Sequence, residues 1–206
     1  MYFLGSLVWS GYGTFTWSNG DQYKGNYVNS LRNGFGVVMY AKSGGRYEGS
    51  WFNDKMHGLG TMTWPLTGDI YTGGWVDNKR KGFGIYRWAA TGDVYEGNWF
   101  DDKMYGRGTM TWSLTGDTYT GDWVDDKRTG FGTYRWAATG DVYEGNWFDD
   151  KMQGQGTMKY TKDGRSVYTG KFYQALRAGT GTLMDRDGKI LYDGQWENDS
   201  FIGTKR

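Results

Sequence analysis

The sequence predicts an all-β protein in which consecutive β-hairpins build an elongated, twisted, single-layer antiparallel sheet. Three observations support this prediction: a repeat of 24 residues recurs along most of the chain, apolar residues alternate within each repeat, and glycines recur at fixed positions. A fixed short period is typical of arrays whose repeats stack on their neighbours. Alternation with a period of two indicates strands that bury one face. We therefore expect residues 1–206 to form one array.

The repeat is clearest in the middle of the chain. Residues 61–108 and 109–156 differ at only eight of 48 positions, which indicates a tandem duplication. Within each copy a shorter motif recurs, since Tyr71-Thr-Gly-Gly-Trp75 returns as Tyr95-Glu-Gly-Asn-Trp99. We place a degenerate first repeat at about residues 2–20, beginning with Phe3-Leu-Gly5-Ser-Leu7. Regular repeats then span about residues 21–160, and looser C-terminal repeats span about residues 161–206.

Glycines divide each repeat into strands and turns. The eight repeats that follow the degenerate one begin at Tyr23, Tyr47, Tyr71, Tyr95, Tyr119, Tyr143, Tyr168 and Tyr192. A first glycine follows each of these tyrosines by two residues, and a second glycine follows the first by nine residues. A third glycine, usually beside Asp, lies in the link between repeats, and this pairing is typical of tight turns that need positive φ. We expect seventeen strands, because the last repeat lacks a complete hairpin.

The register within a hairpin follows from the same spacing. Placing Trp99 opposite Gly106 across a loop of residues 100–105 sets Gly97 opposite Gly108. The glycines then leave shallow places on which large rings can lie. This register directs the aromatic residues of all repeats to one face. The other face is expected to be polar, with residues such as Thr61, Thr63, Thr109, Thr111, Glu96, Asn98, Arg135 and Glu144.

Aromatic rings replace the usual aliphatic core. Leu, Ile, Val and Phe together make up less than a fifth of the chain, whereas 12 Trp and 17 Tyr are present. Each such ring can bury roughly 150–250 Å². A long apolar face without a second layer is typical of an interaction site. The candidate partner-binding residues are Tyr47, Trp51, Trp64, Tyr71, Trp75, Trp88, Tyr95, Trp99, Trp112, Tyr119, Trp123, Trp136, Tyr143 and Trp147.

The composition gives little support to catalysis or metal binding. The chain has no Cys and one histidine, His57, whose place is taken by Tyr105 and Gln153 in other repeats, so we interpret His57 as a loop residue. The segment that begins at Asp185 is similar to the start of a calcium loop, but Trp196 stands where the twelfth-position Glu belongs. We therefore expect no enzyme activity, no metal and no cofactor.

Charge argues against nucleic acid and favours lipid only slightly. The formal net charge is +1, so the attraction that nucleic-acid backbones require is missing. The loop cations are Lys55, Lys79, Arg80, Lys81, Lys103, Lys127, Arg128 and Lys151. Neighbouring aspartates such as Asp77 and Asp101 offset them, so membrane phosphoinositide remains an alternative ligand rather than the leading one.

The motif Tyr-x-Gly-x-Trp, followed at a fixed distance by Gly-x-Gly, resembles the MORN (membrane occupation and recognition nexus) repeat. The resemblance covers about residues 21–203. Two positions depart from it: Phe172 replaces one Trp, and Asp185 stands where earlier repeats have a ring such as Trp136 or Tyr160. It implies a hairpin ribbon that acts as a scaffold for partner proteins, including helical segments, in cytoskeletal, ciliary or membrane-adjacent assemblies. The N-terminus lacks a basic leader, so we expect a cytoplasmic protein without a signal peptide.

These observations leave two classes of function open. The leading one is a non-enzymatic scaffold whose aromatic groove holds an amphipathic or helical segment of a partner protein. The alternative is a carbohydrate- or phospholipid-binding module, because Trp and Tyr platforms also suit sugars. The strand Tyr192–Trp196 is followed by few residues, so we further expect a homodimer through this C-terminal edge strand.

Overall fold

The computed structural model describes residues 8–162 and 166–203, which contain seventeen β-strands and no helix. The strands belong to one open antiparallel sheet. Their bounds are β1 Gly11–Thr16, β2 Gln22–Val28, β3 Leu31–Met39, β4 Arg46–Phe52, β5 Lys55–Trp64, β6 Asp69–Val76, β7 Lys79–Arg87, β8 Val94–Phe100, β9 Lys103–Thr111, β10 Thr118–Val124, β11 Lys127–Arg135, β12 Val142–Phe148, β13 Lys151–Lys159, β14 Val167–Tyr173, β15 Leu176–Met184, β16 Ile190–Glu197 and β17 Ser200–Gly203. The prediction of an all-β hairpin fold with seventeen strands is confirmed.

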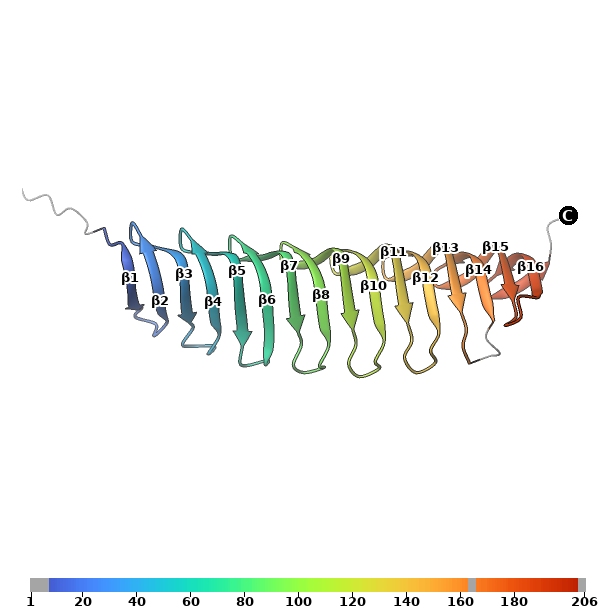
Figure 1. Ribbon diagram of the computed structural model, residues 1–206, viewed down its shortest axis with the longest axis horizontal. Helices are drawn as coiled ribbons and strands as arrows, with labels where there is room; N and C mark the ends of the chain where they lie inside the picture. The colour runs from blue at the N-terminus through green and yellow to red at the C-terminus, as the bar shows by residue number, and fades with distance from the viewer. Residues whose placement is uncertain (1–7, 163–165, 204–206) are drawn as a thin grey trace, which may run out of the picture. The chain divides into compact units, whose positions relative to one another are not determined.

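The chain divides into two compact parts. The N-terminal part runs to Ala90 and includes Trp99–Asp102, and the C-terminal part comprises Thr91–Asn98 and the chain from Lys103 onward. In the N-terminal part β1 to β7 pair in chain order, each antiparallel to the next (Figure 1). In the C-terminal part β9 to β17 pair in the same way. Each part is therefore a meander of hairpins.

A row of glycines crosses the strands of each part. In the N-terminal part the row is Gly13, Gly25, Gly36, Gly49, Gly60, Gly73 and Gly84. In the C-terminal part it is Gly108, Gly121, Gly132, Gly145, Gly156, Gly170, Gly181 and Gly194. A Cβ added to Gly60 would stand 2.3 Å from the Tyr47 hydroxyl, so the row is the floor on which the tyrosine rings lie.

The prediction of a six-residue hairpin loop is wrong. The turn after β8 contains only Asp101 and Asp102, whose φ angles are 48° and 68°, and β9 already begins at Lys103. Two consecutive residues with positive φ form the kind of two-residue turn whose twist matches that of the flanking strands. Asp-Asp is a weaker signal for this turn than Asn-Gly, so the sequence alone does not place the start of the second strand at Lys103.

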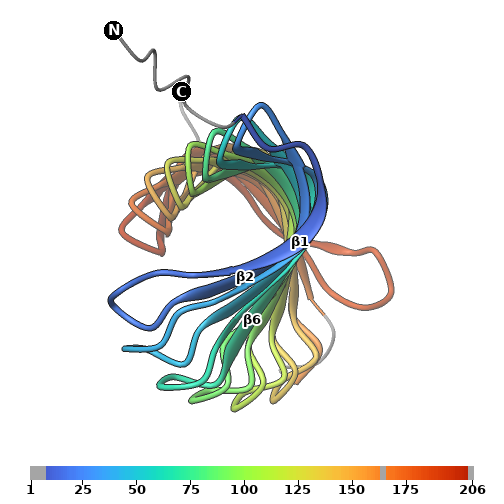
Figure 2. The ribbon, with the colours of Figure 1, turned by 90° about the vertical axis from the view of Figure 1, so that its left-hand side faces the viewer.

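The predicted pairing of Trp with the second glycine is also wrong within a hairpin. In the equivalent hairpin Trp51 lies opposite Met56, whereas Gly58 lies opposite Trp75 of the next hairpin. A bulge between Gly49 and Trp51 shifts the register, and Gly58 adopts a φ of +75° on the partner strand. Bulges bend strands and increase their twist. Figure 2 shows this for the N-terminal part, where β1, β2 and β6 bend and turn relative to one another.

The links between repeats are tight turns with positive-φ glycines, as predicted. Gly68, with a φ of +81°, donates its N–H to the Trp64 carbonyl at 2.7 Å. The carboxylate of Asp69 then accepts the N–H of Ala89 in the next link at 2.9 Å. The predicted link glycine Gly164, the proposed start of the first repeat at residues 2–7 and the terminal residues 204–206 lie outside the described residues.

The prediction of a wholly polar opposite face is wrong. Polar residues such as Glu96 and Glu144 do lie there, but they alternate with exposed apolar side chains. Examples are Phe35, Phe52, Leu59, Phe83, Phe131 and Phe148, which are 48–73% exposed. These residues follow or precede glycines and tryptophans by one position, so strand alternation turns them away from the aromatic face.

Candidate protein-binding face

Tyrosine and tryptophan rings interlock into one core row. Tyr47 is 0% exposed and packs edge-to-face against Trp51 at 5.2 Å and against Trp75 of the next hairpin at 5.4 Å between ring centroids. The Tyr47 hydroxyl donates to the Ser50 carbonyl at 2.9 Å, and the Trp75 indole donates to the Gly60 carbonyl at 3.2 Å. Edge-to-face pairs add about 0.5–1.5 kcal/mol each beyond the burial of their area. The core row therefore couples each hairpin to its neighbours.

Ten of the fourteen predicted site residues belong to this core row. They are Tyr47, Trp51, Tyr71, Trp75, Tyr95, Trp99, Tyr119, Trp123, Tyr143 and Trp147, and they are 0–5% exposed. Rings covered to this extent by their own chain offer almost no area to a partner. Sequence spacing could not show this, because the covering ring comes from the next repeat and its orientation depends on the bulge.

The other four predicted residues form a second row that is accessible. Together with three further rings they make up the link row, which is Trp17, Tyr40, Trp64 and Trp88 in the N-terminal part and Trp112, Trp136 and Tyr160 in the C-terminal part. Every ring of the link row is partly exposed.

Hydrogen bonds within the links hold the link row in place. The carbonyl of Trp112 accepts the N–H of Gly116 at 2.8 Å, and the N–H of Trp112 donates to the Asp117 carbonyl at 3.0 Å. Trp136 makes the same two backbone bonds, to Gly140 at 2.7 Å and to Asp141 at 3.0 Å. The tyrosine Tyr134 packs between the two rings, 5.4 Å from Trp112 and 4.5 Å from Trp136 between centroids. The link row is therefore a set of rigid, partly exposed aromatic platforms.

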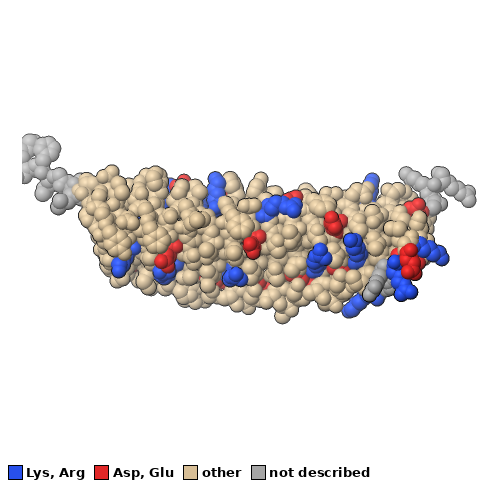
Figure 3. Space-filling view, viewed as in Figure 1, with Lys and Arg blue, Asp and Glu red and all other residues tan. Residues whose placement is uncertain are grey.

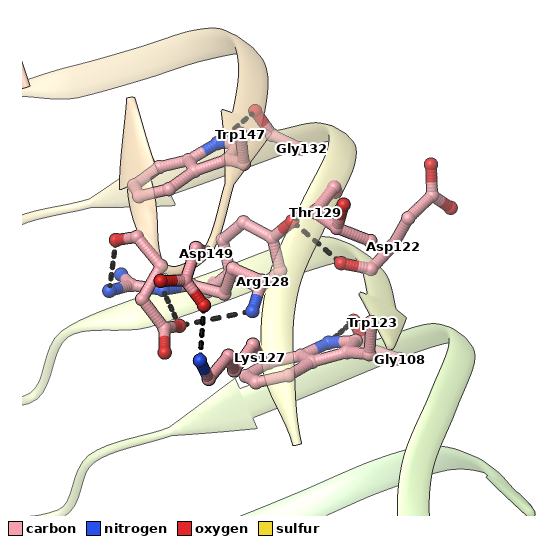
Figure 4. Close-up of polar contacts among 11 residues, drawn as sticks. Gly108, Asp122, Trp123, Lys127, Arg128, Thr129, Gly132, Trp147 and Asp149 are labelled. Atoms are coloured by element: carbon pink, nitrogen blue, oxygen red, sulfur yellow. Dashed lines mark hydrogen bonds and ion pairs between the residues drawn. The ribbon is translucent and has the colours of Figure 1, made fainter. Parts of the chain in front are cut away.

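Arginine and methionine alternate beneath the rings with a period of two repeats. The positions are Arg32, Met56, Arg80, Met104, Arg128, Met152 and Arg177. The guanidinium carbon of Arg128 lies 4.5 Å from the Trp147 ring centroid (Figure 4). It lies 5.3 Å from the ring centroid of Tyr134. Arg80 lies 4.2 Å from Trp99 in the same manner. These cation–π contacts place a charge next to the face without exposing it fully.

Each of these arginines is locked by an aspartate in the turn of the next hairpin. The Asp150 carboxylate accepts the backbone N–H and the Nε–H of Arg128, both at 3.0 Å. Arg128 in turn donates from Nη2 to the Asp150 carbonyl at 2.9 Å and accepts the Asp150 N–H at 3.1 Å. These Arg–Asp pairs, called clips below, were not predicted, although the sequence carries a signal for them: an Asp follows each of the four arginines by 22 residues.

The link carboxylates are stabilised by neutral donors. Burial alone would raise the pKa of Asp69, but hydrogen bonds from the Ala89 N–H, the Tyr86 hydroxyl and Thr67 lower it below its ordinary value. Burial and the bond to Asp69 raise the pKa of Tyr86 to about 12. Asp69 therefore carries its negative charge at neutral pH, close to the aromatic face.

A groove opens on the aromatic face at the first links. It has a volume of about 510 Å³ and is bordered by Trp17, Tyr40 and Trp51, with Asp21 and Arg32 among its polar residues. The Asp21 carboxylate accepts the Ala41 N–H at 2.8 Å. The aromatic face of the N-terminal part therefore contains a groove as well as partly exposed rings.

The edge formed by the two-residue turns of the hairpins, here called the turn edge, carries paired charges. Lys55 bonds Asp77 at 3.3 Å, and Lys79 bonds Asp101 at 3.0 Å. In the C-terminal part Lys103 and Lys127 pair with aspartates in the same way. Charges of both signs are interspersed on the face seen in Figure 3. This pairing matches the expectation that aspartates offset the loop cations.

The described part of the chain contains neither a metal-binding cluster nor a helix that could span a membrane. Residues 8–162 and 166–203 contain no group of three or more His, Cys, Asp or Glu side chains that could hold a metal ion. None of their segments is a helix long and apolar enough to cross a membrane. His57 lies beside Phe52, with 5.7 Å between ring centroids.

Consecutive antiparallel hairpins joined by a Tyr, Trp and Gly core define a β-hairpin repeat protein. The family model of the MORN repeat matches residues 8–22, 23–44, 47–65, 71–90, 95–113, 119–138 and 143–165, which is more than half of the chain. The chain therefore belongs to the MORN-repeat family, and the resemblance inferred from its motifs is confirmed. The family model does not extend to the hairpins from β14 to β17 beyond residue 165.

Comparison with solved structures found distant similarity to three domains. The TCP domain of Drosophila melanogaster SAS-4 (dCPAP), in complex with a proline-rich motif of Ana2 (dSTIL), has a TM-score of 0.46 and 11% identity, covering 87% of this chain and 86% of its own. The CPAP G-box domain has a TM-score of 0.48 and 12% identity, covering 89% and 100%. The TCP10c domain of Drosophila melanogaster Sas-4 has a TM-score of 0.44 and 12% identity, covering 90% and 100%. A comparison with curated proteins found no match. Likenesses this distant assign no function to the chain.

Proposed function

We propose that this chain is a non-enzymatic scaffold that binds an amphipathic or helical segment of a partner protein along the link row. The observation that carries the proposal is the division of the aromatic face into a closed core row and a partly exposed link row. Rings such as Trp112 and Trp136 are fixed by backbone hydrogen bonds and still have accessible faces. Rigid aromatic residues with accessible area are the usual anchors of protein interfaces.

The test compares variants of the two faces. Trp112→Ala with Trp136→Ala removes the exposed platforms, and Phe131→Ser with Phe148→Ser changes apolar residues of the opposite face that are 48% and 67% exposed. In proximity labelling in cells, the Trp variant should lose specific partners of the wild type, and the Phe variant should keep them. Far-UV circular dichroism of both variants checks that the fold persists. A partner set that is lost only with the Phe variant would overturn the proposal.

Ligand titrations separate the scaffold from the alternative module. Trp fluorescence of the wild-type chain is followed with helical peptides, with oligosaccharides and with vesicles that contain phosphoinositide. A scaffold responds to peptides alone. Saturable quenching by oligosaccharide or by vesicles would favour the carbohydrate- or phospholipid-binding alternative.

We also propose a homodimer that forms through the exposed edge of β16 near the C-terminus. β17 pairs with β16 only through Gln195, Trp196 and Glu197, so in the described residues the first half of β16 faces outward beyond β15. Leu191 and Tyr192 in that half are 44% and 48% exposed. An open strand edge of this kind can pair with another chain. Light scattering at rising concentration tests the homodimer, and a monomer mass throughout would exclude it.

The proposed place of the scaffold is the cytoplasm, in an assembly associated with the cytoskeleton or a cilium. Membership of the MORN-repeat family supports this placement, since the resemblance to MORN proteins implies such assemblies. A fluorescent fusion imaged against cytoskeletal and ciliary markers tests it, and a purely nuclear or secreted signal would contradict it.

A further inference from the structure

We propose that the link row of the C-terminal part binds a basic, proline-rich segment in the polyproline II conformation. This inference rests on the proposed scaffold function, and at this part of the link row it replaces the helical segment of the partner with a polyproline II segment. It depends on two properties of the link row: the spacing of its rings and the charge that accompanies each ring.

The distance between neighbouring rings of the link row is the width of one hairpin. Trp112, Trp136 and Tyr160 occupy equivalent positions in consecutive hairpins, so adjacent rings are separated by two strand spacings. Strands lie about 4.8 Å apart, which gives about 9.6 Å per ring. A polyproline II helix repeats every three residues at about 3.1 Å each, or about 9.3 Å. The two periods differ by about 0.3 Å.

Other regular conformations fit this spacing less well. Two turns of an α-helix advance about 10.8 Å, so a helix drifts by about 1.2 Å at each ring and by about 2.4 Å across three rings. A β-strand advances about 9.9 Å in three residues, but its third residue points to the opposite side. Only polyproline II presents the same side of the ligand to every ring of the row. Aromatic-lined grooves are also the surfaces that recognise this conformation in other domains.

A carboxylate accompanies each of the three rings. Asp93 accepts the N–H of Ser113, the residue after Trp112, at 2.8 Å. Asp117 accepts the N–H of Ala137, the residue after Trp136, at 2.9 Å. These bonds place each carboxyl group beside the ring that precedes the donor.

The third ring has the same arrangement. Asp141 accepts the N–H of Thr161, the residue after Tyr160, at 2.7 Å. All three aspartates are partly exposed, so their carboxyl groups remain accessible to a ligand.

Cations offset these aspartates only in part. Residues 89–93, 113–117 and 137–141 each contain one Asp and neither Lys nor Arg. Lys162 follows Tyr160, and Arg128, which is paired with Asp150, lies 5.8 Å from the Trp112 ring centroid. The links thus repeat one ring and one negative charge at each hairpin. A ligand that matches this pattern places a cation once in every three residues and prolines between the cations. Charge complementarity therefore selects a basic partner over an acidic one.

The direct test uses two synthetic peptides of identical composition. One consists of four Pro-Pro-Lys triplets, and the other carries the same eight prolines in one block and the four lysines in a second block. Isothermal titration with the full chain should show that the periodic peptide binds about tenfold tighter, because only it matches ring and charge together. The same charge in both peptides cancels the non-specific attraction. Equal affinities would overturn the inference.

Variants locate the binding on the link row. Trp112→Leu with Trp136→Leu keeps apolar bulk but removes the flat ring faces, and it should weaken the periodic peptide about tenfold. Asp93→Asn removes a charge while its side-chain oxygen still accepts the Ser113 N–H, and it should weaken binding and its salt dependence. Asp149→Asn is the matched control, since it removes one charge at the turn edge. An effect of Asp149→Asn equal to that of Asp93→Asn would contradict the charge argument.

A helical peptide separates this inference from the proposed function. An amphipathic helix with one basic and one apolar face is titrated against the wild type and the Trp variant. If the helix binds at the link row and the periodic proline peptide does not, the partner chemistry is wrong and the scaffold function stands. If the partners found by proximity labelling survive the loss of both tryptophans, the scaffold function fails at this site and the inference fails with it.

Discussion

The phenol of Tyr71 lies directly over Gly84, and a Cβ added to this glycine would stand 2.3 Å from the phenolic oxygen. Tyr71 is 0% exposed, and its hydroxyl donates to the Gly74 carbonyl at 3.0 Å. The ring therefore has no room to retreat without breaking that bond. Ring and glycine together close the core of the hairpin.

Replacing this glycine should be costly. We expect Gly84→Ala to lower the free energy of unfolding by about 3 kcal/mol, because the added methyl displaces a buried ring. Urea unfolding followed by Trp fluorescence measures the loss. Gly82→Ala is the control, since its φ is +83° and a Cβ there meets nothing within 4 Å. It should cost about 1 kcal/mol from backbone conformation alone. If both variants lose the same free energy of unfolding, the Tyr71 ring does not prevent a side chain at position 84.

The clip between hairpins can be removed without changing the turn. Asp149 and Asp150 both adopt positive φ, so Gly suits either position. Asp150→Gly removes the acceptor of two Arg128 hydrogen bonds and should lower the free energy of unfolding by about 1–2 kcal/mol. Asp149→Gly removes only the exposed ion pair with Lys127 and should leave the urea midpoint unchanged. A larger effect at Asp149 would refute the role of the clip.

Local patterns in the sequence were sufficient for the strands and the glycine row, because both depend on spacing along one repeat. The equivalents of the predicted Gly97 and Gly108 pair, such as Gly145 and Gly156, lie opposite each other. Which of the predicted rings remain accessible could not be predicted in this way. Tyr47 is closed by Trp75, which lies 28 residues further along and reaches Tyr47 only through inter-hairpin packing.

Alkaline pH should destabilise the chain through its buried tyrosines. Burial, with help from Asp69 and Asp117, raises the pKa of Tyr86 and of Tyr134 to about 12 from an ordinary 10. The folded state therefore holds these protons more tightly than the unfolded state does. The resulting stability is complete below pH 10 and is lost as the pH rises from 10 toward 12.

Urea unfolding at pH 8 to 11.5 measures this loss. Tyr86→Phe with Tyr134→Phe should reduce the slope, and the remaining buried tyrosines should keep it negative. Tyrosinate absorbance should rise together with the loss of native Trp fluorescence. Complete ionisation of the tyrosines in a chain with native fluorescence would contradict the prediction.

The alternation of Arg and Met predicts which methionine positions tolerate substitution by arginine. The N–H of Met104 donates to the Asp126 carboxylate at 2.8 Å, which is the place that Asp150 takes beside Arg128. Met104→Arg therefore finds a carboxylate already positioned and should lower the free energy of unfolding by less than about 1 kcal/mol. Met152 lies beside Ala175, whose N–H donates to the Met152 carbonyl at 3.0 Å and which has no side-chain acceptor.

Met152→Arg should therefore leave a half-buried guanidinium without its partner and cost about 3 kcal/mol. The two variants make the same substitution at equivalent places, so volume and helix or strand propensity cancel in the comparison. Ala175→Asp added to Met152→Arg should recover most of the loss, because Ala175 already adopts the positive φ of the clip aspartates. Failure of this rescue, with Met104→Arg as damaging as Met152→Arg, would show that the carboxylate clip does not determine where arginine fits.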